Sequence, residues 1–323
     1  MMDWKGRHVL VTGGGGFIGS WVAMELASRG ARVTIFVRDK EREIGYKLHG
    51  LENKVKVVEG NLKDYSAVRH AIQASETEVC FHIAAQPLVQ FATESPVETF
   101  ESNIQGTWHV MEACRTGEHV ERIIVASSDK AYGVQATLPY TEDSQLHGLY
   151  PYDASKACTD IIARSYSASY GMNVAVTRNA NIYGGGDLNF SRIVPDAIRC
   201  VLLGKKLLIR SDGTPERDYM YIKDAVSAYA TLAENLHRKE VSGQAFNFGT
   251  GKPINVLELF KKIAAICGRP DAETEVLGEA RNEIDRQYLS SEKARKVLGW
   301  KPKFTLDEGL RETVEWYRSY LKA

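Results

Sequence analysis

The sequence has no excess of charge of either sign and no long apolar run. Its 323 residues include 41 Lys and Arg against 41 Asp and Glu, a formal net charge of +0. This balance provides no basic field for nucleic acid or an anionic membrane surface, so we expect neither as a partner. No apolar run reaches the ~18 residues of a membrane span, and residues 1–8 lead directly into a predicted strand instead of a secretory signal.

Cysteine and histidine are also too sparse and scattered to build a disulfide framework or a metal site. Five cysteines occur without CxxC spacing, which is typical of reduced thiols in a cytoplasmic protein. They are Cys80, Cys114, Cys158, Cys200 and Cys267. The 8 histidines show no metal-ligand spacing. We therefore expect a cytoplasmic protein with no metal.

Apolar β-rich runs alternate with helical patterns through the first two-thirds of the chain. Strands are predicted at residues 8–12, 32–37, 55–58, 79–83, 123–126 and 174–178. Helices are predicted at residues 18–29, 65–75, 95–116 and 154–170. This alternation predicts right-handed βαβ crossovers and an α/β fold with a Rossmann-type doubly wound parallel sheet.

A glycine-rich turn follows the first predicted strand and opens the first predicted helix. Gly13, Gly16 and Gly19 have the spacing that permits a tight turn, backbone approach to a pyrophosphate, and close helix–strand packing. The free N–H groups and positive dipole end of the helix would then face the phosphates. The pattern predicts a dinucleotide site.

The predicted pattern of secondary structure changes after Gly184, where shorter elements and proline-bounded turns begin. We therefore predict an NAD(P)-binding Rossmann domain at residues 1–186, with returns to it at about 217–250. Residues 187–216 and 251–323 are predicted to form a smaller, interleaved C-terminal lobe that binds the substrate. Two surface helices are expected at residues 291–298 and 306–320.

The end of the second predicted strand bears on the choice between NAD and NADP. An acid at this point would hold a ribose 2′-hydroxyl, whereas an arginine would suit a 2′-phosphate. Val37 occupies the expected acidic position and Arg38 follows it, which slightly favours NADP. Asp39 could recover the acidic role, and both charges could also be solvated loop residues.

A hydroxyl, a tyrosine and a lysine form the candidate catalytic set. Tyr152 and Lys156 are four residues apart on a predicted helix, so they share one face, and a nearby cation favours the ionised phenol. Ser128 ends a predicted strand at the carboxyl edge of the sheet, where ligands bind in such folds. Tyr152 and Lys156 alone would fit a surface helix pair, but the glycine-rich turn favours a catalytic role.

Together these motifs resemble the extended short-chain dehydrogenases/reductases, and among them the nucleotide-sugar epimerases and dehydratases. The resemblance extends over essentially the whole chain. The matching segments are residues 12–19, 82–85, 103–107, 128, 152–156, 178–184, 217–219 and 298–302.

The resemblance implies a nucleotide-diphosphate sugar as substrate and NAD(P)+ that is tightly bound and recycled. Ser128 would hydrogen-bond the sugar 4-hydroxyl, Tyr152 would remove its proton, and C4 would give hydride to the nicotinamide. Lys156 would hold the nicotinamide ribose and tune Tyr152. Members of this family usually dimerise through a helix pair, so a homodimer is expected, with the helix at 154–170 as a candidate face.

The resemblance also assigns the remaining binding residues. Cofactor contacts are expected from Gly13, Gly16, Phe17, Ile18, Gly19, Arg38, Asn61, Leu62, Ala84, Ala85, Gln86, Asn103, Tyr152 and Lys156. Substrate contacts are expected from Ser128, Asn181, Val194, Arg217 and Arg281. Arginine's planar fork suits a diphosphate, although each of these two arginines could instead form a surface ion pair.

Asp129 and Lys130 bear on which reaction follows the common 4-keto intermediate. Sugar 4,6-dehydratases carry an acid directly after the serine, and this Asp-Lys pair resembles the CDP-glucose 4,6-dehydratases in particular. Asp129 would protonate the departing C6 oxygen, and Lys130 would assist C5 deprotonation or hold the enolate. The two residues could also form a simple ion pair at a strand end.

The sequence is compatible with three functions. The first is a nucleotide-sugar 4,6-dehydratase, and the second is a nucleotide-sugar 4-epimerase that needs Ser128, Tyr152 and Lys156 but neither Asp129 nor Lys130. The third is a non-catalytic NAD(P)-binding sensor. The glycine-rich turn and residues 216–221 follow the general family form more closely than the CDP-glucose group, so the nucleotide base is open as well.

Overall fold

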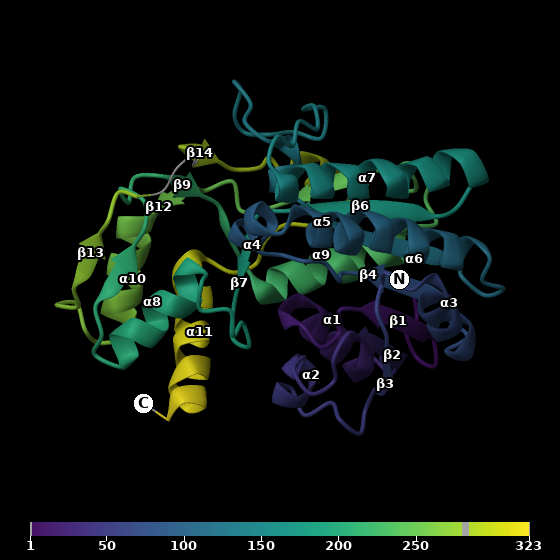
Figure 1. Cartoon of the computed structure of the whole chain (residues 1–323), viewed down its shortest axis with the longest axis horizontal. Coiled ribbons are helices and arrows are strands. Elements are labelled where there is room, and N and C mark those ends of the chain that lie inside the picture. The colour runs from purple at the N-terminus through teal and green to yellow at the C-terminus, as the bar shows by residue number, and fades with distance from the viewer. Residues whose placement is uncertain (1, 280–283, 323) are drawn as a thin grey trace.

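A seven-stranded parallel sheet organises the chain in the computed structural model, which describes residues 2–279 and 284–322 (Figure 1). The strand order is β11-β6-β5-β4-β1-β2-β3, so the chain reverses direction across the sheet between β1 and β4. The strands are β1 (His8–Thr12), β2 (Arg32–Val37), β3 (Lys56–Glu59), β4 (Val79–His82), β5 (Arg122–Ser128), β6 (Val174–Asn179) and β11 (Ala245–Phe248). The predicted doubly wound α/β fold is confirmed.

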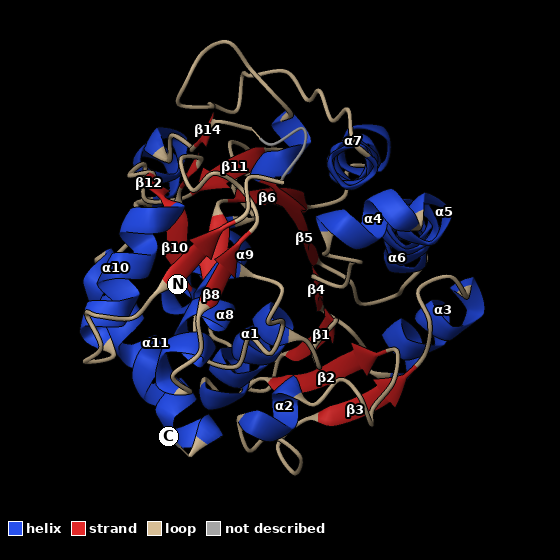
Figure 2. Ribbon diagram, turned by 60° about the vertical axis from the view of Figure 1, so that its left-hand side comes forward, coloured by secondary structure: helices blue, strands red, loops and turns tan. Residues whose placement is uncertain are grey.

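Helices cover both faces of this sheet because alternate apolar side chains on each strand point to opposite sides. On β1, Leu10 packs in the cluster of one face, whereas Val9 and Val11 pack in the cluster of the other. Figure 2 shows the two layers on either side of the strands. The helices around the sheet are α1 (Phe17–Ser28), α2 (Gly45–Leu48), α3 (Tyr65–Ala74), α4 (Val89–Glu94), α5 (Pro96–Phe100), α6 (Gly106–Arg115), α7 (Pro151–Tyr170) and α9 (Ile222–Asn235).

The helix predicted at residues 95–116 is interrupted by a π-helical segment. It consists of α5, the π-helical turn η1 (Glu101–Gln105) and α6 in direct succession. Such single π turns often occur at functional sites. Here the segment contains Asn103, whose buried side chain bonds to neighbouring elements of the ligand-binding edge.

The second lobe is built from short strands and longer helices beside the sheet (Figure 1). A parallel pair, β7 (Asn181–Tyr183) and β10 (Tyr219–Tyr221), links it to the main sheet. Its remaining elements are α8 (Ile193–Leu202), β8 (Leu207–Ile209), β9 (Glu216–Arg217), β12 (Ile254–Asn255), α10 (Val256–Ile266), β13 (Thr274–Val276), β14 (Arg286–Gln287) and α11 (Leu306–Leu321). Beyond this lobe, β11 returns to the main sheet and pairs in parallel with β6.

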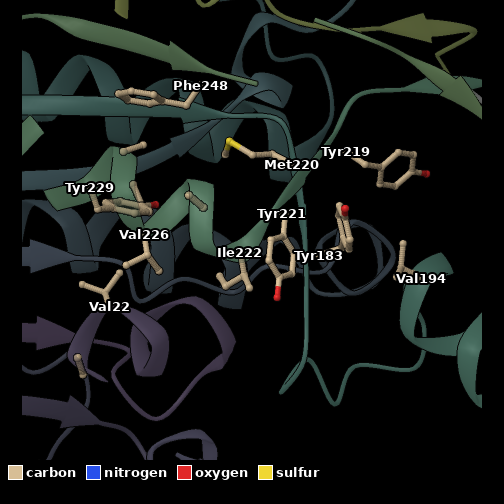
Figure 3. Close-up of a cluster of buried hydrophobic side chains, with 14 of the residues drawn as sticks. Val22, Tyr183, Val194, Tyr219, Met220, Tyr221, Ile222, Val226, Tyr229 and Phe248 are labelled. Carbon is tan, nitrogen blue, oxygen red and sulfur yellow. The ribbon is translucent and has the colours of Figure 1, made fainter. Parts of the chain in front are cut away.

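One apolar core extends from the sheet into the second lobe. In Figure 3, Tyr183 and Tyr221 lie next to Ile222 at the start of α9, with Val226 further along that helix. The rings of Tyr183 and Tyr221 are 5.7 Å apart between centroids. The two lobes therefore share buried surface, which fixes the position of the cleft between them.

The C-terminal segment differs in part from its prediction. The helix expected at residues 291–298 forms over 292–298, but its main part is the π-helical turn η3 (Ala294–Leu298), and Trp300 just after it is buried. Between residues 2–279 and 284–322, no helix has the length and apolarity needed to cross a bilayer. The same residues contain no cluster of three His, Cys, Asp or Glu side chains suited to a metal ion.

Candidate active site

The glycine-rich turn connects β1 to α1 and leaves the first backbone N–H groups of the helix uncapped. Gly16 precedes the helix without any side-chain cap. Gly13 has φ +70°, and a Cβ there would lie 2.8 Å from the Ala84 Cα. A Cβ at Gly19 would lie only 2.2 Å from the Gly13 carbonyl oxygen. Only glycine fits these positions, so the turn keeps its backbone open to a pyrophosphate.

A cavity of about 450 Å³ lies over this turn and along the carboxyl ends of β1, β2 and β4. The predicted cofactor residues that line it are Gly13, Gly16, Phe17, Ile18, Gly19, Arg38, Asn61, Leu62, Ala84, Ala85 and Gln86. Asn103 does not line this cavity. Its amide bonds to the Gln86 backbone and to Ser155 Oγ, so it fixes the cavity wall to α7 from behind. The uncapped helix end and the glycine cradle fit a dinucleotide such as NAD(P)+.

Three charged side chains lie in the loop that follows β2. Arg38 lines the cavity, its side chain is 67% exposed, and its guanidinium lies 3.8 Å from Glu98 Oε1. Asp39 is turned to its own loop, where Oδ1 accepts hydrogen bonds from the backbone N–H groups of Glu41 and Arg42. Glu43, which the sequence analysis did not single out, lines the cavity, and burial raises the pKa of its carboxyl.

A second cavity of about 700 Å³ adjoins the first, and the two share Phe17, Ile18 and Arg192 in their walls. It gathers most of the predicted catalytic and substrate residues, namely Ser128, Asp129, Lys130, Tyr152, Lys156, Asn181 and Val194. Arg217 lies on β9 and does not line this cavity. Arg281 falls outside the described residues.

The start of α7 holds Tyr152 and Lys156 in place. Ser127 on β5 donates a hydrogen bond to the Lys156 carbonyl oxygen, and Ser155 donates one to the Tyr152 carbonyl oxygen. The Lys156 ammonium donates to the Ala126 carbonyl oxygen at 2.9 Å. Burial lowers the pKa of Lys156 to about 8. These bonds fix the helix end against β5, so the shared face predicted for Tyr152 and Lys156 points at the end of the sheet.

The electrostatic surroundings of Tyr152 differ from the prediction. Burial raises the pKa of its phenol well above the ordinary value, and Asp129 and Asp153 raise it further. The cation that opposes this rise is that of Arg192, aided by a hydrogen bond with Ser128. Lys156 is not among the main groups that shift this pKa. Arg192 was not identified from the sequence because it comes from a distant loop before α8.

Ser128, Asp129 and Lys130 form a compact polar group where β5 ends. Ser128 Oγ donates to Asp129 Oδ1 at 3.0 Å and accepts from the Lys130 backbone N–H at 3.2 Å, which caps the short 3₁₀ turn η2 (Asp129–Tyr132). Asp129 is only 2% exposed. Its Oδ2 has no hydrogen-bond partner among the described residues and lies 3.8 Å from the Lys130 ammonium. Asp129 lines the cavity, and a buried carboxylate oxygen with no hydrogen-bond partner among the described residues is available for proton transfer to a bound ligand.

A second buried carboxylate, Asp153, lies near this group and was also missed from the sequence. Burial raises the pKa of Asp153 to about 6, Asp129 adds to the rise, and the charge of Lys130 opposes it. Asp153 does not line the cavity. Lys130 therefore acts electrostatically on two carboxylates, one that lines the cavity and one that does not.

Two further side chains of the cavity wall are not among the site residues predicted from the sequence. Arg210 follows β8 in the second lobe, and Gln90 lies on α4 beside the main sheet. They come from segments 120 residues apart in the chain. No spacing in the sequence could have indicated that they meet.

The arrangement suits reversible oxidation of a bound alcohol followed by acid–base chemistry. Ser128 and Tyr152 line the larger cavity together with Asp129 and Lys130. A substrate in the larger cavity would thus have one carbon near Tyr152. Its neighbouring atoms would face Asp129 and Lys130.

Comparisons with known proteins agree with this geometry. Residues 10–313 match the family described as GDP-mannose 4,6 dehydratase. CDP-glucose 4,6-dehydratase of Salmonella typhimurium is 28% identical over 99% of this chain and 92% of its own length. UDP-glucose 4-epimerase of Thermotoga maritima, solved with UDP-glucose, has a TM-score of 0.89 and 30% identity, over 97% of this chain and 99% of that chain. dTDP-glucose 4,6-dehydratase of Bacillus anthracis, solved with NAD, has a TM-score of 0.86 and 27% identity, with 98% of each chain covered.

Proposed function

Because the chain belongs to the GDP-mannose 4,6 dehydratase family, we propose that it is a nucleotide-sugar 4,6-dehydratase, which converts an NDP-hexose into the NDP-4-keto-6-deoxyhexose. The observation that carries this proposal is the position of Asp129. Its carboxylate is buried at the wall of the larger cavity, next to Ser128 and within 3.8 Å of the Lys130 ammonium. An epimerase has no step that needs an acid and a cation at this point.

The first half of the reaction uses Ser128 and Tyr152. Ser128 orients the sugar 4-hydroxyl and Tyr152 takes its proton, while the C4 hydrogen leaves as hydride. Bound NAD(P)+ supplies the reversible redox chemistry of this step. Lys156 holds the cofactor ribose and Arg192 offsets the cost of forming a buried phenolate. Asn181 and Val194 shape the cavity around the substrate.

The second half removes water from C5 and C6. The new 4-ketone acidifies the C5 proton, which the Asp129 carboxylate accepts, and the Lys130 ammonium stabilises the resulting enolate. Asp129 gives its proton to the C6 oxygen as the C6–O bond breaks, so the group leaves as water. Return of hydride to C6 and of a proton to C5 completes the 4-keto-6-deoxy product. We assign Lys130 the role of a cation because it pairs with Asp129 at 3.8 Å and its charge opposes the rise in the pKa of Asp153.

One assay separates this function from its alternatives. Purified protein is incubated with nucleotide-activated glucose, mannose, N-acetylglucosamine and glucuronate, and the sugar masses are followed. Loss of one water from any substrate is the expected result. An unchanged mass with a new stereoisomer would establish the 4-epimerase instead, and no turnover despite bound cofactor would indicate the sensor.

For the cofactor, NADP+ is the form we expect to bind more tightly. Support comes from Arg38, whose exposed guanidinium lines the smaller cavity, and from Asp39, whose carboxylate is engaged by its own loop. Glu43 is the competing feature, since its carboxylate could hold a free 2′-hydroxyl. Titration of both dinucleotides into wild type and Arg38→Ala tests this. Tighter binding of NAD+ by the wild type would overturn the preference.

A homodimer is the expected assembly, formed through the α5, α6 and α7 face. Apolar side chains on these helices are exposed, among them Val97, Phe100, Trp108 and Ile161. An apolar patch of this kind is typical of a surface covered by a partner. Sedimentation should give a dimer for the wild type and a monomer for Ile161→Lys with Trp108→Glu. A monomeric wild type would rule this face out as a homodimer interface.

We further expect a cytoplasmic location. All five cysteines are free thiols, and Cys158 is the one that is not fully buried. Free thiols persist in reducing compartments. Fractionation of the source cells tests this, and recovery of the protein outside the cytoplasm would contradict it.

A further inference from the structure

A glutamine from the second lobe reaches the Asp129–Lys130 pair from the far end of the chain. Gln287 lies on β14, more than 150 residues after the pair. Its side chain is fully buried. None of the sequence motifs includes it, and it does not line the substrate cavity. Gln287 therefore contacts the pair from outside the cavity lining.

The amide of Gln287 bonds to both members of the pair. The Lys130 ammonium donates a hydrogen bond to Gln287 Oε1, and Gln287 Nε2 donates one to the Asp129 carbonyl oxygen at 3.2 Å. An ammonium can only donate and a carbonyl oxygen can only accept, so the amide has one possible orientation. A neutral side chain with an acceptor and a donor is what satisfies these two groups together.

The backbone around Gln287 is held on two sides. On one side, β14 pairs in parallel with β9, and Gln287 is opposite Arg217 in the register. On the other, Tyr140 exchanges backbone hydrogen bonds with Tyr288 and Ser290, at 3.0 and 2.9 Å. The strand β14 thus presents Gln287 to Lys130. Arg217, a predicted contact of the diphosphate, lies opposite Gln287 on the neighbouring strand β9.

We propose that Gln287 is a positioning residue for the elimination step, holding the Lys130 ammonium and the Asp129 backbone where the C5 and C6 atoms of the substrate need them. This inference rests on the proposed dehydratase function. Lysine has a long flexible side chain, and ordering it for one geometry costs conformational entropy in each turnover unless a fixed partner restrains it. Gln287 supplies that restraint from a buried strand, so the cation is in place before the ketone forms.

The proposal distinguishes the two halves of the reaction. Ser128, Tyr152 and Lys156 carry out the C4 oxidation and make no hydrogen bond to Gln287 among the contacts described. Loss of the amide should therefore slow the removal of water while C4 oxidation continues. Oxidised sugar and reduced cofactor would then accumulate together, because elimination has become the slow step.

Gln287→Met is the main test, since methionine keeps the length and volume of the side chain but makes neither hydrogen bond. We expect the rate of water loss to fall on the order of tenfold, as for one lost hydrogen bond to a charged group. The rate of C4 oxidation, followed by absorbance of the reduced nicotinamide in a single turnover, should change by less than about twofold. Uptake of solvent deuterium at C5 should slow together with the loss of water.

Leu289→Ala is the matched control. Leu289 is a fully buried residue on the same segment, and it packs with Tyr132 and Tyr140 instead of bonding to the pair. It should lower the melting temperature yet leave the ratio of water loss to C4 oxidation unchanged. If Leu289→Ala changes that ratio as much as Gln287→Met does, the effect is general loosening and the proposal is wrong.

The remaining outcomes are also decisive. If Gln287→Met does not fold, Gln287→Glu replaces it as the test variant, because glutamate cannot donate a hydrogen bond to the Asp129 carbonyl oxygen. An unchanged ratio of water loss to C4 oxidation in this variant would overturn the proposal. If Gln287→Met removes water at the wild-type rate, the proposal is likewise overturned. A wild type that removes water from no nucleotide sugar refutes the dehydratase function itself, which is a separate result.

Discussion

Arg210 and Gln90 form a hydrogen bond in the wall of the larger cavity, with 2.7 Å between the Arg210 Nη1 and Gln90 Oε1 atoms. Arg210 belongs to the second lobe and Gln90 to α4 beside the main sheet. The bond therefore connects the two sides of the cleft. A guanidinium at this point is also well placed to bind a phosphate oxygen of the substrate.

We predict that Arg210→Ala weakens binding of the nucleotide sugar more than it slows the chemistry. KM should rise on the order of tenfold with kcat within about twofold, because the lost contact acts equally on substrate and transition state. Steady-state kinetics checks this. Lys206→Ala, which removes an exposed lysine of the same lobe outside the cavity, should leave KM unchanged. A large fall in kcat with an unaltered KM would contradict the assignment.

The Asp129 carboxylate should matter for water loss and not for C4 oxidation. Asp129→Asn keeps the shape and removes the acid, so we expect water loss to slow by at least about 100-fold. C4 oxidation should persist, seen as reduced nicotinamide that builds up with the 4-keto sugar. If both steps proceed at the wild-type rate, the role given to Asp129 is wrong.

Arg192 should influence the ionisation of Tyr152. Burial raises the pKa of Tyr152, and Arg192 supplies the opposing positive charge, so removing that charge should raise the phenol pKa further. Arg192→Met is expected to slow C4 oxidation at neutral pH by roughly 10-fold and to shift its pH–rate profile to higher pH. Arg192→Lys keeps the charge and should recover most of the rate. Equal losses in both variants would contradict a role for the positive charge of Arg192 in the ionisation of Tyr152.

Asp153 makes stability depend on pH. Its pKa is about 6 in the folded protein and 3.8 in the reference state, so between these values the folded protein holds a proton that the unfolded chain has released. The stability linked to this proton is complete below pH 3.8 and is lost as the pH rises through about 6.

Asp153→Asn should remove this dependence. Relative to wild type, the variant should gain stability on the order of 2 kcal/mol between about pH 4 and pH 7. Urea unfolding of both proteins across this range measures the difference. A difference that stays constant with pH would show that Asp153 does not carry the shifted pKa.

The fold and much of the site followed from local patterns in the sequence. Alternating apolar runs predict buried strands because each strand must bury both faces under helices. The glycine spacing of Gly13 and Gly19 predicts the turn because no larger residue fits there. Local signals failed where helices were irregular: the π-helical turn at Glu101–Gln105 leaves no mark in the periodicity that predicted one continuous helix.

Residues that act through distant contacts could not be identified in this way. Gln287, Arg192 and Arg210 have no motif around them, and each becomes meaningful only beside a side chain from another part of the chain. The tuning of Tyr152 was assigned to Lys156 because the two are one helical turn apart. In the folded protein, burial and the charges of Arg192 and Asp129 decide it.

The sequence by itself determined the parallel sheet, the dinucleotide turn and the Ser128, Tyr152 and Lys156 set, because each depends on residues close together in the chain or on the period of one element. The tertiary structure alone decided how the Asp129–Lys130 pair is surrounded. Burial between β5, α7 and β14 leaves one Asp129 oxygen without a hydrogen-bond partner among the described residues and brings Gln287 to Lys130. Desolvation and hydrogen bonding depend on which atoms meet in space, and spacing along the chain does not contain that information.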